Sequence, residues 1–186
     1  LKVAPELCGR TLTLEVNRIG FRSTASVLVS YGETVVLGTA MVGQRPVQGM
    51  DYFPLSIDYE EKLYAAGKIS GSRFIKREGR PSEEAILIGR IIDRPIRPLW
   101  PKGYRQEVQG ISTVLSTDPT FRPDMIAMIA TSAALMLTGE PFEGPVAGLR
   151  VGMTDRGEFK AFMSVDEYDA SKLDLVVAGT KDGIMM

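Results

Sequence analysis

The sequence DMIAMIATSAALML, residues 124–137, is apolar on almost every side when it is placed on a helix. A helix with a solvent-facing side would show a polar stripe, so this pattern predicts a helix buried in the core. Gly139 follows at a position typical of the residue that ends a helix. We therefore expect residues 124–137 to lie inside the fold.

Strand-like runs lie on both sides of this helix in the sequence. Residues 12–16 alternate apolar and polar side chains, as a half-buried strand does. Residues 25–30 and 34–41 are separated by Tyr31-Gly32-Glu33, which predicts a hairpin. The remaining expected elements are strands at 52–59, 108–116, 146–153, 159–164, 173–178 and 184–186, and a short helix within 60–69.

A second long helix is expected over residues 80–99. Pro81 is assigned to its first turn, and Glu83 and Glu84 place negative charge near the positive end of the helix dipole. Pro95 removes one backbone hydrogen bond and is expected to kink or end the regular helix. This order of strands and helices predicts an α/β domain of the α+β type, in which a mixed sheet packs against helices.

Composition limits the classes of function. The chain has 186 residues, 44% hydrophobic and 24% charged, which is typical of one globular domain. It contains no histidine, so histidine catalysis and histidine metal ligands are excluded. The single cysteine, Cys8, rules out an internal disulfide and fits a reducing compartment, so we expect a cytoplasmic protein without a membrane span. The chain stops inside an apolar run at residues 183–186, which suggests a longer polypeptide.

Positive charge is concentrated at residues 72–105, although the net charge of the chain is only −1. Nine basic residues fall in these 34 positions, against four acidic ones. Arg90, Arg94 and Arg97 share one face of the expected helix, within roughly 60° of one another at about 100° per residue. Arginine forks match phosphate oxygens in two-point contacts. The alternative is a solvated face or pairing with Asp93, and spacing alone does not decide between the two.

The tetrad Phe74-Ile75-Lys76-Arg77 precedes this helix, between glycines that indicate a loop. An aromatic ring beside two cations is a combination that binds single-stranded RNA, because a base stacks on the ring while its phosphate meets the charges. The alternative is that Phe74 and Ile75 are ordinary core anchors. By itself the tetrad is weak support for RNA binding.

Two longer strings carry a family resemblance. GSRFIKREGRPSE, from Gly71 to Glu83, and IIDRPIRPL, from Ile91 to Leu99, closely resemble the first core domain of bacterial polynucleotide phosphorylases. The resemblance runs through residues 1–186 and implies an RNase PH-like domain of the ribosomal protein S5 domain 2-like fold. It also implies an activity in which inorganic phosphate, with Mg²⁺, attacks the 3′ end of single-stranded RNA and releases nucleoside diphosphates.

The resemblance further implies partners and neighbouring domains. The family forms a homotrimeric ring in the cytoplasm, and the resemblance implies an RNA degradosome as a further partner. A second RNase PH-like half, a KH domain and an S1 domain are expected in the full-length protein, so residues 1–186 would be the first RNase PH-like domain, truncated at its C-terminal end. Ile75 stands where the family's channel loop has a second aromatic residue. The RNA-binding residues implied by the resemblance are Phe74, Lys76, Arg77, Arg80, Arg90, Arg94 and Arg97.

The resemblance implies no catalytic and no metal-binding residue in this chain. In the family, a strand of the second half carries Asp-x-Lys shortly after another aspartate. The matching strand here has Asp174, but Val176 replaces the lysine and Tyr168 stands at the earlier aspartate, beside Asp169. Without that lysine, a phosphoryl-transfer site lacks a cation for the phosphate charge.

We therefore expect the RNA-guiding, trimer-forming half of an enzyme of mRNA turnover, inactive by itself. Two alternatives are a non-catalytic RNA-binding ring subunit of an exosome-like assembly and a single-domain RNase PH-type phosphorolytic enzyme. The loop-helix strings and the missing lysine argue against the second alternative.

Overall fold

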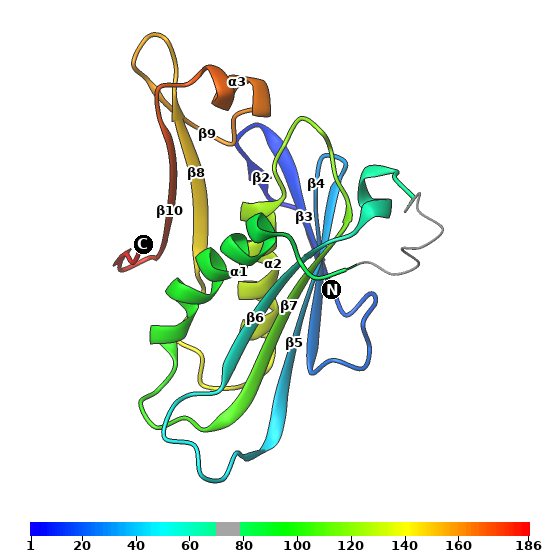
Figure 1. The fold of residues 1–186 in the computed structure, drawn as a ribbon, viewed down its shortest axis with the longest axis vertical. Helices are drawn as coiled ribbons and strands as arrows, with labels where there is room; N and C mark the ends of the chain where they lie inside the picture. The colour runs from blue at the N-terminus through cyan, green and yellow to red at the C-terminus, as the bar shows by residue number, and fades with distance from the viewer. Residues whose placement is uncertain (70–78) are drawn as a thin grey trace.

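The computed structural model describes residues 1–69 and 79–186 (Figure 1). It has three layers: a large sheet, two helices, and a small sheet on the other side of the helices. The helices α1 (Glu83–Ile96) and α2 (Asp124–Met136) fill the middle layer. The expected α+β architecture, a mixed sheet packed against helices, is confirmed.

The large sheet has the strand order β1-β3-β4-β5-β7-β6, with β2 paired to β3. Its strands are β1 (Lys2–Val3), β2 (Glu6–Leu7), β3 (Arg10–Val16), β4 (Ala25–Tyr31), β5 (Thr34–Pro46), β6 (Leu55–Glu61) and β7 (Gln106–Ser116). Neighbouring strands are antiparallel except β6 and β7, which are parallel and are connected through α1. The expected hairpin is present, because β4 ends at Tyr31 and β5 begins at Thr34. The strand expected at 52–59 is β6, which lies slightly later in the chain.

The small sheet is antiparallel and has the order β11-β10-β8-β9. Its strands are β8 (Ala147–Met153), β9 (Phe159–Ala161), β10 (Asp174–Thr180) and β11 (Gly183–Ile184). A short helix that was not expected, α3 (Val165–Ala170), joins β9 to β10. It starts with a capping box, because the Ser164 hydroxyl accepts the Glu167 N–H and the Glu167 carboxylate accepts the Ser164 N–H.

The helix expected over residues 80–99 is shorter and begins later. Ser82 is extended and its hydroxyl accepts the N–H of Ala85, so Ser82 caps α1. Pro81 therefore lies before the helix, which corrects its assignment to the first turn. Pro95 is in the last turn, and the chain continues after Ile96 as a 3₁₀ turn, η2 (Arg97–Leu99). The short helix expected within 60–69 is also a 3₁₀ turn, η1 (Leu63–Ala66).

The buried helix expected at 124–137 is confirmed as α2. Its residues pack against β4, β5 and β7 on one side and against β8 on the other. Gly38 of β5 lets the backbone of α2 come close to the sheet, since a Cβ atom there would lie 2.5 Å from the backbone of Ala130. The hydroxyls of Ser112 and Thr131 lie within hydrogen-bond distance of each other and of the carbonyl oxygen of Ala127, so their two protons are shared among these three buried oxygens. Among the described helices, none is long and apolar enough to cross a membrane.

Candidate nucleic-acid interface

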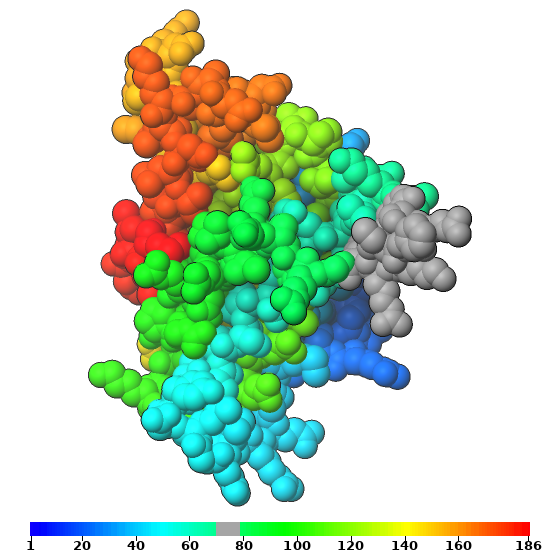
Figure 2. All heavy atoms as spheres, in the orientation of Figure 1, coloured from blue at the N-terminus to red at the C-terminus, as the bar shows by residue number. Residues whose placement is uncertain are grey.

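Two of the three arginines that were expected to share one face of this helix, Arg90 and Arg94, lie on the protein surface in α1. Its inner side, Ala85, Gly89, Ile92, Pro95 and Ile96, is buried. The opposite side exposes Arg90 and Arg94, and Figure 2 shows the green α1 region on the surface of the molecule. Within the part of the chain that the structure describes, neither guanidinium has a hydrogen-bond or ion-pair partner. Both are therefore available to an external anion.

Arg97 has a different environment. Its Nε and Nη2 donate to the two carboxylate oxygens of Asp93, at 3.0 and 2.7 Å. The same guanidinium also donates to the carbonyl oxygens of Leu55, at 3.1 Å, and Phe53, at 3.4 Å. These contacts hold the end of α1 to the start of β6. For Arg97, pairing with Asp93 is the arrangement that the structure has, and RNA binding by this residue stays a prediction.

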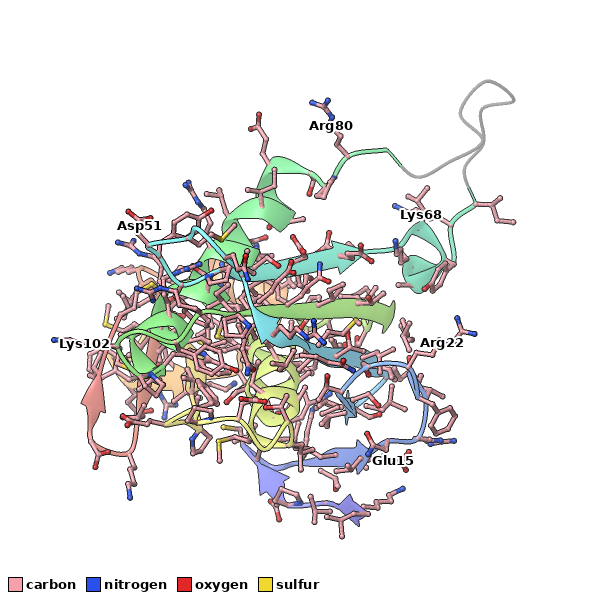
Figure 3. All side chains as sticks on the ribbon, turned by 90° about the horizontal axis from the view of Figure 1, so that it is seen from below. Glu15, Arg22, Asp51, Lys68, Arg80 and Lys102 are labelled. Carbon is pink, nitrogen blue, oxygen red and sulfur yellow. The ribbon has the colours of Figure 1, made fainter. Side chains whose placement is uncertain are left out.

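Arg80 is exposed just before α1 and projects away from the body of the molecule (Figure 3). It borders a groove of about 740 Å³ that is also lined by Lys68, Pro81, Val114 and Thr117. Among residues 1–69 and 79–186, no partner is found for the Arg80 side chain. The other expected RNA-binding residues, Phe74, Lys76 and Arg77, lie outside the described residues.

A second groove runs between α1 and β6. Arg90 lines it together with Asp58, Asp93 and Arg97, and its volume is about 270 Å³. Its charge is mixed, because two carboxylates stand beside two guanidinium groups. The groove therefore offers a phosphodiester no uniformly positive surface.

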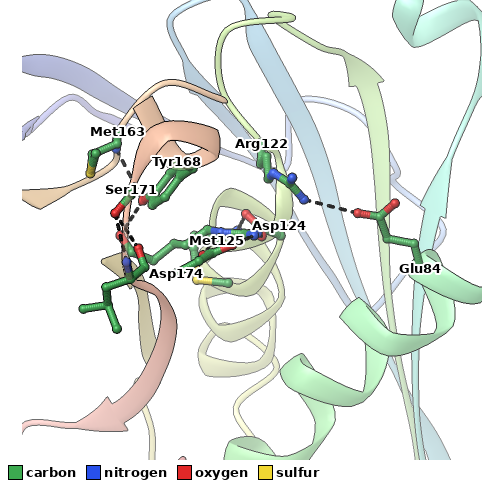
Figure 4. Close-up of polar contacts among 10 residues, drawn as sticks. Glu84, Arg122, Asp124, Met125, Met163, Tyr168, Ser171 and Asp174 are labelled. Carbon is green, nitrogen blue, oxygen red and sulfur yellow. Dashed lines mark hydrogen bonds and ion pairs between the residues drawn. The ribbon is translucent and has the colours of Figure 1, made fainter. Parts of the chain in front are cut away.

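The strand that resembles a reaction strand is engaged in an ion-pair network (Figure 4). Asp174 begins β10, and its carboxylate accepts from Nε and Nη2 of Arg150 at 2.7 and 2.5 Å. Nη1 of Arg150 donates to Asp124 at 2.8 Å. The Arg150 guanidinium lowers the pKa of Asp174 below its ordinary value. Sequence reasoning missed Arg150, because its partners lie 24 and 26 residues away and no local pattern marks them.

Tyr168 and Asp169 also have defined positions. Tyr168 is buried and its hydroxyl donates to the carbonyl oxygen of Arg150 at 2.7 Å, whereas Asp169 is exposed. Among residues 1–69 and 79–186, no three carboxylate or thiol groups converge as metal ligands would. No magnesium ligand is therefore assigned among these residues.

The sequence model of domain 1 of the 3′ exoribonuclease family matches residues 9–141 of this chain. The chain belongs to the 3′ exoribonuclease family. Curated relatives of this family member carry the name polyribonucleotide nucleotidyltransferase. The protein of Alkaliphilus oremlandii is 54% identical over 97% of this chain, and that of Rhizobium meliloti is 52% identical over 100% of it. The chain spans about a quarter of their length, 25% and 26%.

Two solved structures share the fold of this exoribonuclease-family domain. Rice (Oryza sativa) Rrp46 matches 94% of this chain and 78% of its own, with a TM-score of 0.73 and 15% identity. An Archaeoglobus fulgidus exosome with RNA bound to the active site matches 95% of this chain and 76% of its own, with a TM-score of 0.71 and 18% identity. The expected RNase PH-like fold is thereby confirmed.

Proposed function

We propose that this exoribonuclease-family domain guides RNA and forms the ring in a polyribonucleotide nucleotidyltransferase, the enzyme that degrades RNA from 3′ to 5′ by phosphorolysis. The observation that carries the proposal is a contrast within one domain. Arg90 and Arg94 are exposed and have no partner within residues 1–69 and 79–186, while Asp174 is already paired with Arg150. The first arrangement suits binding of a polyanion, and the second leaves no free carboxylate on the strand that resembles the reaction strand. The names of the curated relatives support the same enzyme.

In the proposed reaction, inorganic phosphate attacks the last phosphodiester linkage of single-stranded RNA in line and releases a nucleoside diphosphate. The family resemblance implies magnesium, which, if bound in the full-length protein, would supply positive charge for the transition state. The contribution of this domain is positioning. Its cations hold the strand so that the 3′ end reaches the reaction site in another part of the protein.

The proposed assembly is a homotrimeric ring in the cytoplasm, acting in mRNA turnover and able to join an RNA degradosome. A second RNase PH-like domain, a KH domain and an S1 domain would occupy the remaining length. The support is the length of the curated relatives, of which this chain spans 25% in the Alkaliphilus oremlandii protein.

The test is phosphate-dependent release of nucleoside diphosphates from poly(A), measured for the 186-residue chain and for the full-length product of its gene. We expect activity only from the full-length protein. Activity of the chain alone would contradict the non-catalytic role and would direct attention to Asp169 and Asp174. An inactive full-length protein would contradict the proposed enzyme.

A further inference from the structure

The connection between β3 and β4 contains a tight turn with an aromatic residue and an arginine at its tip. The carbonyl oxygen of Gly20 accepts the N–H of Ser23 at 3.0 Å and the Ser23 hydroxyl at 2.6 Å. Phe21 and Arg22 are therefore the two central residues of a β-turn. Both are exposed, and 79% of Phe21 is open to solvent. An apolar ring this open has no packing role within the described fold.

Hydrogen bonds at the base of this turn hold its tip in one position. The side-chain oxygen of Asn17 accepts the N–H of Ser26 at 3.2 Å, and the Ser26 hydroxyl donates to the carbonyl oxygen of Ile19. The Thr24 hydroxyl oxygen accepts the N–H of Val42 at 3.1 Å, which ties the connection to β5. A loop that is already ordered loses less conformational entropy when it binds a ligand. The turn is therefore suited to present its two central side chains to a partner.

The charge at the turn is positive and is not neutralised by a neighbour. Residues 17–24 contain two arginines and no acidic side chain. Arg18 is paired with Glu15 of β3. Within residues 1–69 and 79–186, the Arg22 guanidinium has no hydrogen-bond or ion-pair partner. Arg22 is therefore available to an external anion, directly beside the open ring of Phe21.

A second exposed aromatic residue and a second unpaired cation lie on the same side of the molecule. Tyr64 of η1 is 56% exposed, and Lys68 follows it in an exposed position. Lys68 has no partner in the described part of the chain. Figure 1 shows η1 and the β3–β4 connection on one side of the molecule, and Figure 3 shows Lys68 and Arg22 projecting from that side. This side thus repeats one combination, an open ring with an unpaired cation close to it in the chain.

We propose that the Phe21–Arg22 turn is a contact point for single-stranded RNA, in addition to Arg90 and Arg94. An unpaired base stacks on the Phe21 ring, and the adjoining phosphate meets the Arg22 guanidinium. A duplex does not offer this contact, because its bases are stacked inside the helix. The choice of RNA as the ligand rests on the proposed function, whereas the presentation of an open ring and an unpaired cation rests on the geometry of the turn.

The experiment measures binding of fluorescently labelled oligo(A) to the 186-residue chain by anisotropy. Phe21→Leu removes the ring but keeps an apolar side chain, and we expect about tenfold weaker binding, the loss of one base–aromatic stack. Phe21→Trp keeps a stacking surface and should retain the affinity. Arg22→Ala should reduce the slope of log K against log salt by about 0.7. The matched controls are Phe159→Leu and Arg156→Ala, an exposed aromatic and an exposed cation in the small-sheet region, which should change neither quantity.

Fluorescence adds a local measurement of the contact. The chain has a single tryptophan, Trp100, which is buried, so the emission added by Phe21→Trp reports the environment of the turn. We expect bound oligo(A) to quench this emission and to leave that of Phe159→Trp unchanged. Unchanged affinity of Phe21→Leu, an unquenched Phe21→Trp, or equal losses in the control variants overturns the proposal.

Two further outcomes separate this inference from the proposed function. A Phe21→Leu chain that binds oligo(A) normally but sediments as a different oligomer would make the turn a protein contact and overturn the inference. A loss of RNA affinity confined to Arg90→Ala/Arg94→Ala would overturn the inference and leave the proposed function standing. An unaltered chain that binds no oligo(A) would overturn both.

Discussion

Arg90, Arg94 and Arg97 have the spacing of one helix face, but the structure gives them two different environments. Arg90 and Arg94 are exposed and have no partner among the described residues, whereas Arg97 donates to Asp93 and to two carbonyl oxygens of the β6 segment. The spacing alone predicts the same environment for all three side chains. The difference arises because Arg97 is at the end of α1, where Pro95 ends the regular helix and the side chain reaches the start of β6.

Replacement of Arg90 and Arg94 by alanine tests the binding role. We expect weaker binding of poly(A) and a shallower dependence on salt, with the slope of log K against log salt reduced by about 1.4, at about 0.7 for each cation on a single strand. Titrations at several salt concentrations measure this slope. The control is the pair Arg156→Ala and Lys181→Ala, two exposed cations in turns of the small sheet. An equal loss in both pairs would indicate general electrostatics rather than a binding face.

Arg97→Ala is expected to reduce stability instead. The substitution removes the Asp93 pair and leaves the carbonyl oxygens of Phe53 and Leu55 without this donor. Because the Arg97 side chain is 43% exposed, the loss in the free energy of unfolding is about 1–2 kcal/mol. Urea unfolding measures it, with Arg94→Ala as the control that should change stability by less than about 0.5 kcal/mol. A larger effect from Arg94→Ala would contradict the assignment of the two roles.

Asp174 makes the stability of the Asp124–Arg150–Asp174 ion-pair network depend on pH. Arg150 lowers the pKa of Asp174 in the folded protein below its ordinary value of 3.8. A carboxyl group with a lowered folded pKa adds stability above its unfolded pKa, and this stability is lost as pH falls through the folded pKa. We therefore expect Asp174→Asn to be less stable than the unaltered chain at neutral pH. In unfolding experiments across pH, the difference between the two proteins should begin to shrink as pH falls towards the ordinary pKa and should vanish only below the lowered folded-state pKa of Asp174. A difference that does not shrink as the solution is acidified would rule out the ion pair as its source.

Elements with a long, consistent pattern were predictable from the sequence, and those fixed by short signals were not. The helix α2 followed from a run that is apolar all round, and the β4–β5 hairpin followed from alternation on both sides of a glycine turn. The helix α3 was missed, although Ser164 and Glu167 form the spacing of a capping box. The strands after α2 were recognised singly, but nothing local indicates that they form a second sheet.

The contact between β5 and α2 depends on Gly38. Gly38→Ala would place a Cβ atom 2.5 Å from the Ala130 backbone, so the helix must move away from the sheet. The expected loss in the free energy of unfolding is about 1–3 kcal/mol, measured by thermal or urea unfolding. Gly43→Ala on the same strand is the matched control, because its added Cβ would meet Glu107 at an ordinary 3.5 Å. Equal destabilisation by both variants would show that strand propensity, not the close helix contact, is responsible.

For the molecule as a whole, the sequence predicted the fold class and which cations to examine, but not how they are partnered. Arg90 and Arg94 could be placed on a surface because helical periodicity alone decides their side. The ion-pair network could not be predicted, since Asp124, Arg150 and Asp174 meet only when the small sheet packs on α2. The aromatic-basic tetrad remains a prediction, because Phe74, Lys76 and Arg77 lie outside the described residues.

In the full-length protein, the proposed positioning of RNA by this domain can be tested separately from the phosphorolysis step. If this domain only positions RNA, Arg90→Ala/Arg94→Ala should slow phosphorolysis of long poly(A) while leaving the rate on very short oligonucleotides nearly unchanged. If the domain guides RNA as proposed, short substrates would not extend from the reaction site to α1, and their reaction would depend only on the part of the protein that carries the chemistry. Release of nucleoside diphosphates under saturating phosphate measures both rates, and Arg156→Ala/Lys181→Ala again serves as the control. An equal fall on long and short RNA would place these arginines in the reaction itself and would contradict a purely guiding role.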